Sequence, residues 1–273
     1  MTGNANSAAG DGGTGRPGSS GPLGPPGLPA SIEAAWGLRD RPSKGPKPGL
    51  TLARIVDAAV GLAAAEGLAA VSMGRVAKEL GVSTMSLYRY VAAKNELYIL
   101  MMEAALGAPP PPPDPAVGWR EALTLWARGQ RAAFHRNLWA LRLPIPGPPS
   151  TPNMVAWWER GMVALDGTGL DDGTRLSVIL LVSGYVRNEA LLMADLDAAV
   201  EASGATPRQV MEGYENTLRR LADPARYPSI ARVMAEGGFG EAGSGGEEEA
   251  DIEFAFGLNC LLDGVEALIR RTG

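Results

Sequence analysis

The chain has 273 residues, 45% of them hydrophobic, which is enough material for two packed domains with irregular ends. Its one cysteine, Cys260, excludes an intramolecular disulfide and a cysteine-rich metal site, and no apolar run is long enough for a transmembrane helix. The formal net charge of −5 argues against nucleic acid as a partner of the chain as a whole. These features are typical of a cytoplasmic protein with no membrane partner.

The distribution of charge changes that interpretation. All four lysines lie within residues 44–106, where four lysines and three arginines stand against five acidic residues. Residues 107–273 instead carry 15 arginines and 22 acidic residues. A basic module on an acidic body is typical of a protein that contacts phosphate groups at one end only. Chance clustering of four lysines is the alternative.

Residues 1–48 are rich in glycine, proline and serine. They are predicted to form a disordered tail, because they bury too little apolar surface to offset the entropy of ordering. The segment 31–36 contains at most one helical turn. The tail ends in four basic residues, placed like an arm that reaches phosphate or the minor groove: Arg39, Arg41, Lys44 and Lys47.

Residues 49–106 are predicted to form a small domain of three helices followed by a connecting helix. The first helix has apolar residues at three- to four-residue spacing, which is typical of one buried face. These residues are Leu52, Ile55, Val56, Ala59, Val60 and Ala63. Gly49 or Thr51 can cap its start, and Gly67 suits its end.

Two short helices and a longer one follow. Ser72 and Ser83 are good N-caps for the short helices, and Gly81 can adopt the left-handed conformation of the turn between them. The connecting helix runs over 94–106, and the proline run 109–113 stops it.

Residues 107–273 are predicted to form a larger helical domain. No segment shows the alternation of a β-strand, so the fold class is all-α. The predicted helices lie at 119–137, 154–165, 172–197, 207–221, 230–235 and 248–271.

Residues 72–91 read SMGRVAKELGVSTMSLYRYV. Two short helices around a glycine turn form a helix-turn-helix, whose second helix enters the major groove of DNA. If Leu87 and Val91 face inward, helical spacing turns four side chains outward: Thr84, Met85, Tyr88 and Arg89. The same pattern also occurs in ordinary helical bundles, where these side chains would only be solvated.

The outward side chains suit different contacts with DNA. The Arg89 guanidinium can read the O6 and N7 atoms of guanine, while Thr84 and Met85 can touch thymine methyl groups. Five side chains are better placed for phosphate groups: Ser72, Arg75, Tyr88, Tyr90 and Lys94.

The stretch 52–106 resembles the TetR family of transcriptional regulators. The matching motifs are ARIVDAAVGLAAAEGL in the first helix, GVS at 81–83 and SLYRYVAAKNEL at 86–97. The resemblance implies DNA contacts from Ser72, Thr84, Met85, Ser86, Tyr88, Arg89, Tyr90 and Lys94. Two positions depart from the family: Gly74 replaces a basic residue, and Ala93 replaces the asparagine that caps the connecting helix.

The larger domain resembles the ligand-binding and dimerisation domain of the tetracycline-repressor branch. The resemblance implies a mostly apolar small-molecule cavity, with these candidate residues: Trp126, Phe134, His135, Trp139, Trp157, Trp158 and Tyr185. Aromatic residues at helical spacing are usually core, which is the alternative for each. The tetracycline repressor binds a magnesium chelate of its drug through histidines. This chain has one histidine, so that chemistry cannot be carried over, and we expect neither metal nor cofactor.

The helices at 172–197 and 248–271 are the predicted homodimer interface, since the family pairs them in a four-helix bundle. The first is apolar on nearly all sides and must be covered on all sides. The second has a leucine-rich stripe formed by Leu258, Leu261, Leu262, Val265, Leu268 and Ile269. It also has a stripe of small residues formed by Gly257, Cys260 and Gly264. One stripe can pack on the core and the other on a partner.

The sequence therefore predicts a ligand-responsive transcriptional regulator, a repressor that a small hydrophobic molecule releases from a palindromic operator in double-stranded DNA. Two-fold symmetry of the dimer would match the palindrome. An enzyme is the rival interpretation, but the sequence has no glycine-rich phosphate loop, metal-ligand spacing or nucleophile elbow. A third interpretation is a dimeric binding protein that has lost DNA recognition. The outward face at 84–89 argues against it.

Overall fold

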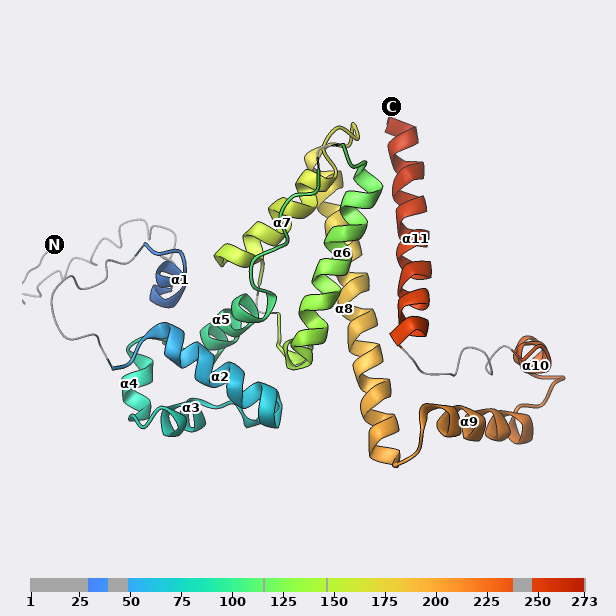
Figure 1. Ribbon diagram of the computed structural model, residues 1–273, viewed down its shortest axis with the longest axis horizontal. Helices are drawn as coiled ribbons and strands as arrows, with labels where there is room; N and C mark the ends of the chain where they lie inside the picture. Colours follow the sequence, from blue (N-terminus) through green and yellow to red (C-terminus); the bar gives the residue numbers. More distant parts are fainter. Residues whose placement is uncertain (1–28, 39–48, 115, 146, 238–246, 273) are drawn as a thin grey trace, which may run out of the picture.

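The computed structural model describes residues 29–38, 49–114, 116–145, 147–237 and 247–272. Predictions about residues 1–28 and 39–48, including the basic arm, lie outside these ranges. All secondary structure in the described ranges is helical, which confirms the all-α fold class (Figure 1). In chain order the elements are α1 (Ala30–Ala35), α2 (Leu52–Glu66), η1 (Leu68–Ala70), α3 (Met73–Glu79), α4 (Thr84–Tyr88), α5 (Lys94–Leu106), α6 (Trp119–Arg136), η2 (Leu138–Arg142), α7 (Pro152–Ala164), α8 (Asp172–Ser203), α9 (Pro207–Leu221), α10 (Pro228–Ala235) and α11 (Glu247–Thr272), where η marks a 3-10 helix.

The helix-turn-helix domain is built from α2, α3 and α4, and its helix ends follow the predicted caps. The Thr51 side chain accepts a hydrogen bond from Arg54 N–H at the start of α2, and Gly67 ends that helix with a φ of +81°. Ser72 and Ser83 cap α3 and α4 in the same way. Gly81 has a φ of +65°, so it supplies the left-handed turn between the two helices.

Residues 29–38 differ from the predicted disordered tail. They form α1, whose Ile32 is 1% exposed within the core of the DNA-binding domain. The Ser31 hydroxyl donates to Glu96 at 2.6 Å, and the Trp36 indole donates to the carbonyl of Ser150 at 2.8 Å. These tertiary contacts stabilise a helix that is too short to persist alone.

The segment η2 follows the predicted domain boundary at residue 106 in sequence, but it packs into the domain that precedes this boundary. Trp139, Ala140 and Leu143 pack into the hydrophobic core formed by α2, α3, α4 and α5. From the other side, the Arg187 guanidinium on α8 donates to the carbonyl of Leu141 at 2.6 Å. The two domains therefore share a segment rather than meeting at a linker.

The body consists of α6, α7, α8 and α11 around a second core. The helices α6 and α7 approach closely at Gly161 on α7, where a Cβ would lie 2.8 Å from Trp126 on α6. In Figure 1, α9 and α10 project away from the body, and their described residues include none that is buried. The helix α8 runs to Ser203, six residues beyond the predicted end at 197, and Gly204 terminates it with a φ of +67°.

Among the described helices, α8 is also long and apolar enough to cross a membrane by length and composition alone, which the sequence did not predict. About a third (33%) of its most apolar window is buried in the fold, and α8 contacts α6, α7 and α11. One side of its apolar surface therefore forms the core of the body.

Candidate DNA-binding face and ligand cavities

The outer face of α4 carries the residues predicted to read bases. Leu87 and Val91 are fully buried, which sets the rotation of the helix. As a result Met85 is 74% exposed, Tyr88 is 44% exposed, and Arg89 at the helix end is exposed too. The structure thus turns these three side chains outward as predicted, and their contact with DNA stays a prediction.

The hydroxyl side chains next to this face also stabilise the motif itself. Ser72 Oγ accepts from Arg75 N–H at 3.2 Å, so its own hydroxyl proton remains for a phosphate oxygen. Ser86 Oγ lies 2.9 Å from Ser83 Oγ, which caps α4. Thr84 and Ser86 are both partly exposed at the start of α4.

Tyr90 and Lys94 differ in how free they are to meet phosphate groups. The Tyr90 hydroxyl is partly buried and donates to the carbonyl of Leu50 at 3.0 Å, so its proton is used inside the domain. Lys94 is exposed, with its Nζ 5.1 Å from the centre of the Tyr98 ring. Of the two, Lys94 is the better phosphate contact.

Arg75, a predicted phosphate contact, is paired within the domain. Its Nη2 lies 2.5 Å from Glu66 Oε1, and both side chains are about half exposed. An exposed ion pair of this kind contributes only about 0–1 kcal/mol. Arg75 can therefore exchange Glu66 for a phosphate group at little cost.

Most of the predicted ligand-binding aromatic residues belong to the core of the body. Trp126 and Phe134 are buried, and the Trp126 indole donates to the carbonyl of Trp157 at 2.8 Å. The Trp157 indole donates to the carbonyl of Gly107 at 3.0 Å. Trp158 is partly buried against the same core. The hydrogen bond between Trp126 and Trp157 holds α6 against α7.

Tyr185 connects α8 to α11. Its hydroxyl donates to the carbonyl of Phe254 at 2.9 Å, and the two rings stack with centres 5.7 Å apart. Gly257 leaves room for it, because a Cβ there would overlap the Tyr185 hydroxyl. Gly257 therefore faces its own chain, whereas Cys260 and Gly264 of the predicted small-residue stripe are exposed.

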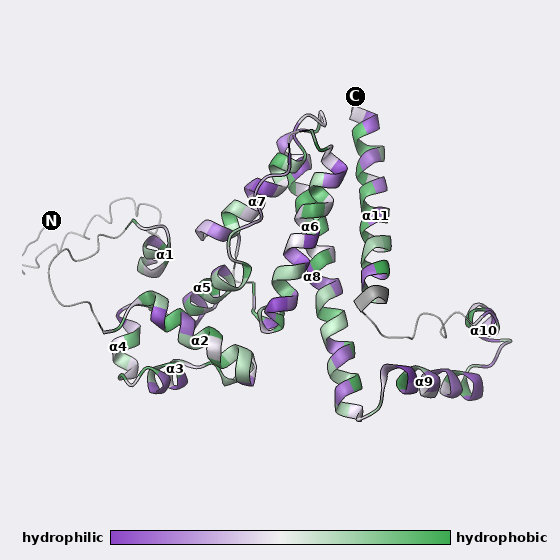
Figure 2. Ribbon diagram, in the orientation of Figure 1, coloured by the Kyte–Doolittle hydropathy of each residue, from purple (hydrophilic) through white to green (hydrophobic). Residues whose placement is uncertain are grey.

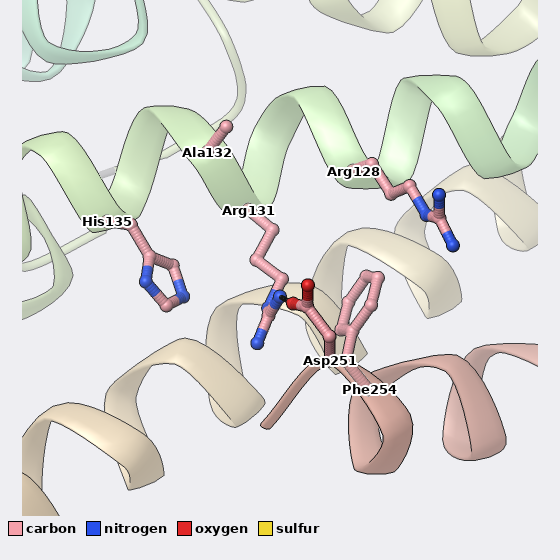
Figure 3. Close-up of a pocket in the computed structure, with 6 residues that line it drawn as sticks. All are labelled: Arg128, Arg131, Ala132, His135, Asp251 and Phe254. Carbon is pink, nitrogen blue, oxygen red and sulfur yellow. Dashed lines mark hydrogen bonds and ion pairs between the residues drawn. The ribbon is translucent and has the colours of Figure 1, made fainter. Parts of the chain in front are cut away.

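A first cavity of about 260 Å³ lies between α6 and the start of α11 (Figure 3). Its lining is mixed: Arg128, Arg131, Ala132, His135, Asp251 and Phe254. Among these, His135 is the only residue that we predicted from sequence as a ligand contact.

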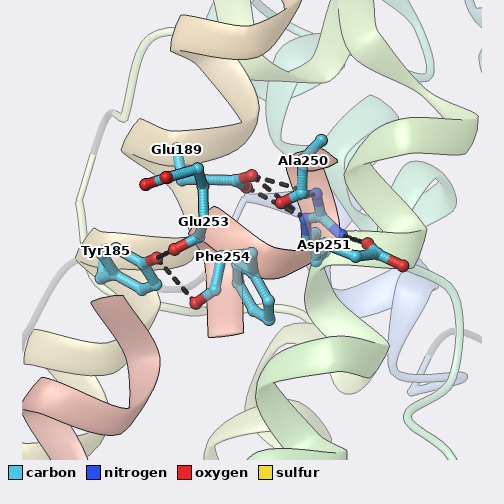
Figure 4. A network of polar contacts seen from close by, with 7 residues as sticks. Tyr185, Glu189, Ala250, Asp251, Glu253 and Phe254 are labelled. Carbon is cyan, nitrogen blue, oxygen red and sulfur yellow. Dashed lines mark hydrogen bonds and ion pairs between the residues drawn. The ribbon is translucent and has the colours of Figure 1, made fainter. Parts of the chain in front are cut away.

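An ion-pair network forms one wall of this cavity (Figure 4). Arg131 lies 3.1 Å from Glu189, pairs with Asp251, and stacks its guanidinium 4.6 Å from the centre of the Phe254 ring. Burial lowers the pKa of Arg131, but hydrogen bonds to Glu189 and Asp251 outweigh it and raise the pKa overall. Burial raises the pKa of the nearby Tyr185. Arg131 is thus a fixed cation that joins α6, α8 and α11.

A second cavity of about 440 Å³ lies where the two domains meet. One wall comes from α2, η1 and the turn between them: Ala63, Ala64, Gly67 and Leu68. The other comes from the body and η2: His135, Arg136, Leu138, Trp139, Arg142 and Ala194. His135 lines both cavities, and Trp139 lines the second only.

Arg131 and Glu189 were not predicted as site residues. Their signal in the sequence is a charged residue on an otherwise apolar helix face, since buried charges occur in pairs. Glu189 stands on α8 next to buried Ala190, and 58 residues separate it from its partner. Only the fold reveals such a pairing.

Residues 55–101 match the family of bacterial regulatory proteins named tetR, and residues 111–269 match the tetracyclin repressor-like C-terminal domain. The chain belongs to the TetR family. The HTH-type transcriptional repressor DrrR1 of Streptomyces coeruleorubidus is 36% identical over 98% of this chain and 97% of its own. An HTH-type transcriptional regulator of Saccharopolyspora erythraea is 28% identical over 75% of this chain and 84% of its own.

Solved structures of similar fold agree with this assignment to the TetR family. Apo ActR from Streptomyces coelicolor has a TM-score of 0.67 at 28% identity, covering 84% of this chain and 100% of its own. ActR in complex with actinorhodin has a TM-score of 0.66 at 28% identity, covering 81% and 98%. The prediction of a DNA-binding transcriptional regulator with an N-terminal helix-turn-helix is confirmed. No group of three or more His, Cys, Asp or Glu in the described ranges is arranged to hold a metal ion.

Proposed function

We propose that this TetR-family protein is a homodimeric repressor that binds a palindromic operator and releases it when a small hydrophobic molecule binds the body. The observation that carries the proposal is the outward face of α4, on which Met85, Tyr88 and Arg89 are exposed around a fully buried Leu87. The similarity to the repressor DrrR1 over nearly the whole chain supports repression rather than activation. A protein that binds bacterial DNA works in the cytoplasm. The relatives are transcriptional regulators, which argues against an enzyme.

On the operator, the second short helix would enter the major groove. Arg89 and Met85 then contact base edges, while Ser72 and Lys94 contact phosphate groups on either side. Ser86, Thr84 and Tyr88 lie on or beside the same face. Tyr90 supports the start of α2 through its hydrogen bond to Leu50, and its contact with DNA stays a prediction.

The dimer interface is proposed on α8 and α11, which both carry hydrophobic residues along their length (Figure 2). Four leucines on α8 are about half exposed: Leu180, Leu181, Leu192 and Leu196. On α11, Ile252 is 63% exposed and Phe256 is 67% exposed, at the four-residue spacing of one helix face that continues through Cys260 and Gly264. Uncovered apolar area on two long helices favours burial against a second copy, which completes a four-helix bundle.

The effector site is proposed at the cavity between α6 and α11 in Figure 3. ActR, which has a similar fold, has been solved in complex with actinorhodin and with (S)-DNPA. Here Phe254 and His135 offer ring surfaces beside the charged groups of Arg128 and Arg131. Of the residues predicted from sequence, Phe134, Trp126, Trp157, Trp158 and Tyr185 support the helices that form this site.

The experiment is fluorescence anisotropy with labelled DNA from upstream of the protein's own coding sequence. A repressor of this type binds that fragment with steep salt dependence and much more tightly than random DNA. Equal affinity for both fragments would contradict operator recognition. No binding to either would favour the alternative of a dimeric binding protein without DNA recognition.

A further inference from the structure

The cavity at the domain junction is lined by both apolar and nitrogen-bearing side chains. Its floor is apolar, formed by Ala63 and Leu68 from one domain and by Leu138 and Trp139 from the other. A volume of about 440 Å³ is within the ordinary range for small-molecule sites, which is about 300–1,000 Å³. A ligand there would contact both domains at once.

Cationic groups stand at the edge of this apolar floor. Arg136 is exposed and has no ion-pair partner within the described residues. Arg142 pairs with Asp195, and His135 contributes a third nitrogen-bearing side chain. Among the described residues, no acidic side chain lines the cavity. The lining therefore favours an anionic head over a cationic one.

Trp139 contributes its ring to this floor. Its indole N–H has no acceptor among the described residues, whereas the buried indoles of Trp126 and Trp157 each donate to a carbonyl. Because this N–H is closed off from solvent, it does not face the open cavity, and only other atoms of the Trp139 side chain line the site. Thr151 and Arg160 also have buried unpartnered atoms, but neither lines this cavity.

We propose that the domain-junction cavity is a second binding site, for a planar aromatic anion whose ring lies on the apolar floor and whose acidic group meets Arg136. The site is separate from the effector cavity of the proposed function, with His135 between them. Because its walls come from both domains, a ligand that binds one arrangement of the domains better than another biases that arrangement.

The test uses the full chain and two fluorescent probes that differ only in charge. They are 1-anilinonaphthalene-8-sulfonate and its uncharged analogue N-phenyl-1-naphthylamine. Arg136→Gln should weaken binding of the sulfonate about 2- to 5-fold, as expected for one exposed charge pair, and leave the uncharged probe unchanged. The matched control is Arg128→Gln, which changes the other cavity only. Equal effects of the two variants would overturn the proposal.

Filling the cavity provides a second test. Ala64→Phe places a ring in the site from the side of α2 and should weaken both probes at least tenfold. Ala65→Phe is the control, because Ala65 is the exposed neighbour that does not line the cavity. Unchanged binding to the Ala64 variant would overturn the proposal.

Leu138→Trp fills the cavity from the opposite wall and should weaken both probes in the same way. The test therefore stands even if the Ala64 variant fails to fold. The titrations contain no DNA, so their outcome is independent of whether operator binding is confirmed.

Discussion

The hydroxyl of Ser31 donates to the carboxylate of Glu96 at 2.6 Å, which joins α1 to the first turn of α5. The same carboxylate accepts the backbone N–H of Ala92 at 3.2 Å, near the helix start that has no side-chain cap at Ala93. Glu96 thus compensates for the position where the family usually has asparagine. Through this contact, a segment that precedes the helix-turn-helix becomes part of its support.

Removal of the α1 anchor should destabilise the DNA-binding domain. Ile32→Ala removes a fully buried side chain and should lower the free energy of unfolding by about 2–5 kcal/mol. Leu38→Ala is the control, because Leu38 is 70% exposed and should change stability by less than about 0.5 kcal/mol. Denaturant unfolding measures both. Equal, small effects would mean that α1 is not docked in solution.

Arg89 and Lys94 should affect DNA binding in different ways. Arg89→Ala should cost about 1–3 kcal/mol on the operator and little on random DNA, because a base contact is sequence-specific. Lys94→Ala should weaken binding to both DNAs and reduce the slope of log affinity against log salt by about 1. Anisotropy titrations at several salt concentrations distinguish the two. Equal loss on random DNA would reduce Arg89 to a phosphate contact.

The Arg131–Glu189 pair should be important for the stability of the body. Both side chains are largely buried, so Glu189→Gln leaves a buried guanidinium without its main partner and should cost about 3 kcal/mol. The control is Glu212→Gln, which breaks an exposed pair with Arg208 on α9 and should cost about 0.3–0.5 kcal/mol. Similar melting curves for the two variants would show that Asp251 alone satisfies Arg131.

The proposed dimer interface can be tested by variants that leave the isolated chain undisturbed. No atom outside its own helix lies within 4 Å of a Cβ built at Gly264 on α11 or at Gly184 on α8, so an arginine fits the isolated chain at both sites. Gly264→Arg and Gly184→Arg should each shift sedimentation to monomer. Gly61→Arg on α2 has equal space and should remain dimeric. Unchanged dimers in the first two variants would place the interface elsewhere.

Asp171 should make the stability of α8 depend on pH. Hydrogen bonds from the Thr174 hydroxyl and N–H hold the pKa of its carboxyl below the ordinary value of 3.8. Because the pKa is lowered on folding, the stabilisation is complete above pH 3.8 and is lost as pH falls through the lowered value. Asp171→Ala should therefore melt earlier than the parent at neutral pH, and the gap should close in acid. A constant gap at every pH would contradict the charged cap.

Local patterns predicted the helix-turn-helix well. Ser72, Ser83 and Gly81 act within a few residues of themselves, so caps and turns can be read directly from the chain. The roles of Ile32 and Trp139 could not be read in this way. Both are buried by residues far away in sequence, and a six-residue helix or a 3-10 turn has no period long enough to detect.

The candidate ligand site was harder to predict for a related reason. An aromatic side chain has the same helical spacing whether it fills the core, as Trp126 does, or lines a cavity, as Trp139 does. What distinguishes them is which other helices cover each ring, and that depends on the three-dimensional fold. The sequence therefore suggested a set of candidate residues, and the three-dimensional contacts show which of them lie in the core and which line a cavity.

The insertion of η2 into the DNA-binding domain has a practical consequence for protein engineering. A fragment that stops at residue 106 lacks Trp139, Ala140 and Leu143, and so leaves part of its apolar interior open to water. We expect such a fragment to aggregate rather than to act as a portable reader of DNA. Chimeras that exchange recognition modules between relatives should keep η2 with the module that it fills, and should redesign the Arg187 contact to Leu141 together with the donor body.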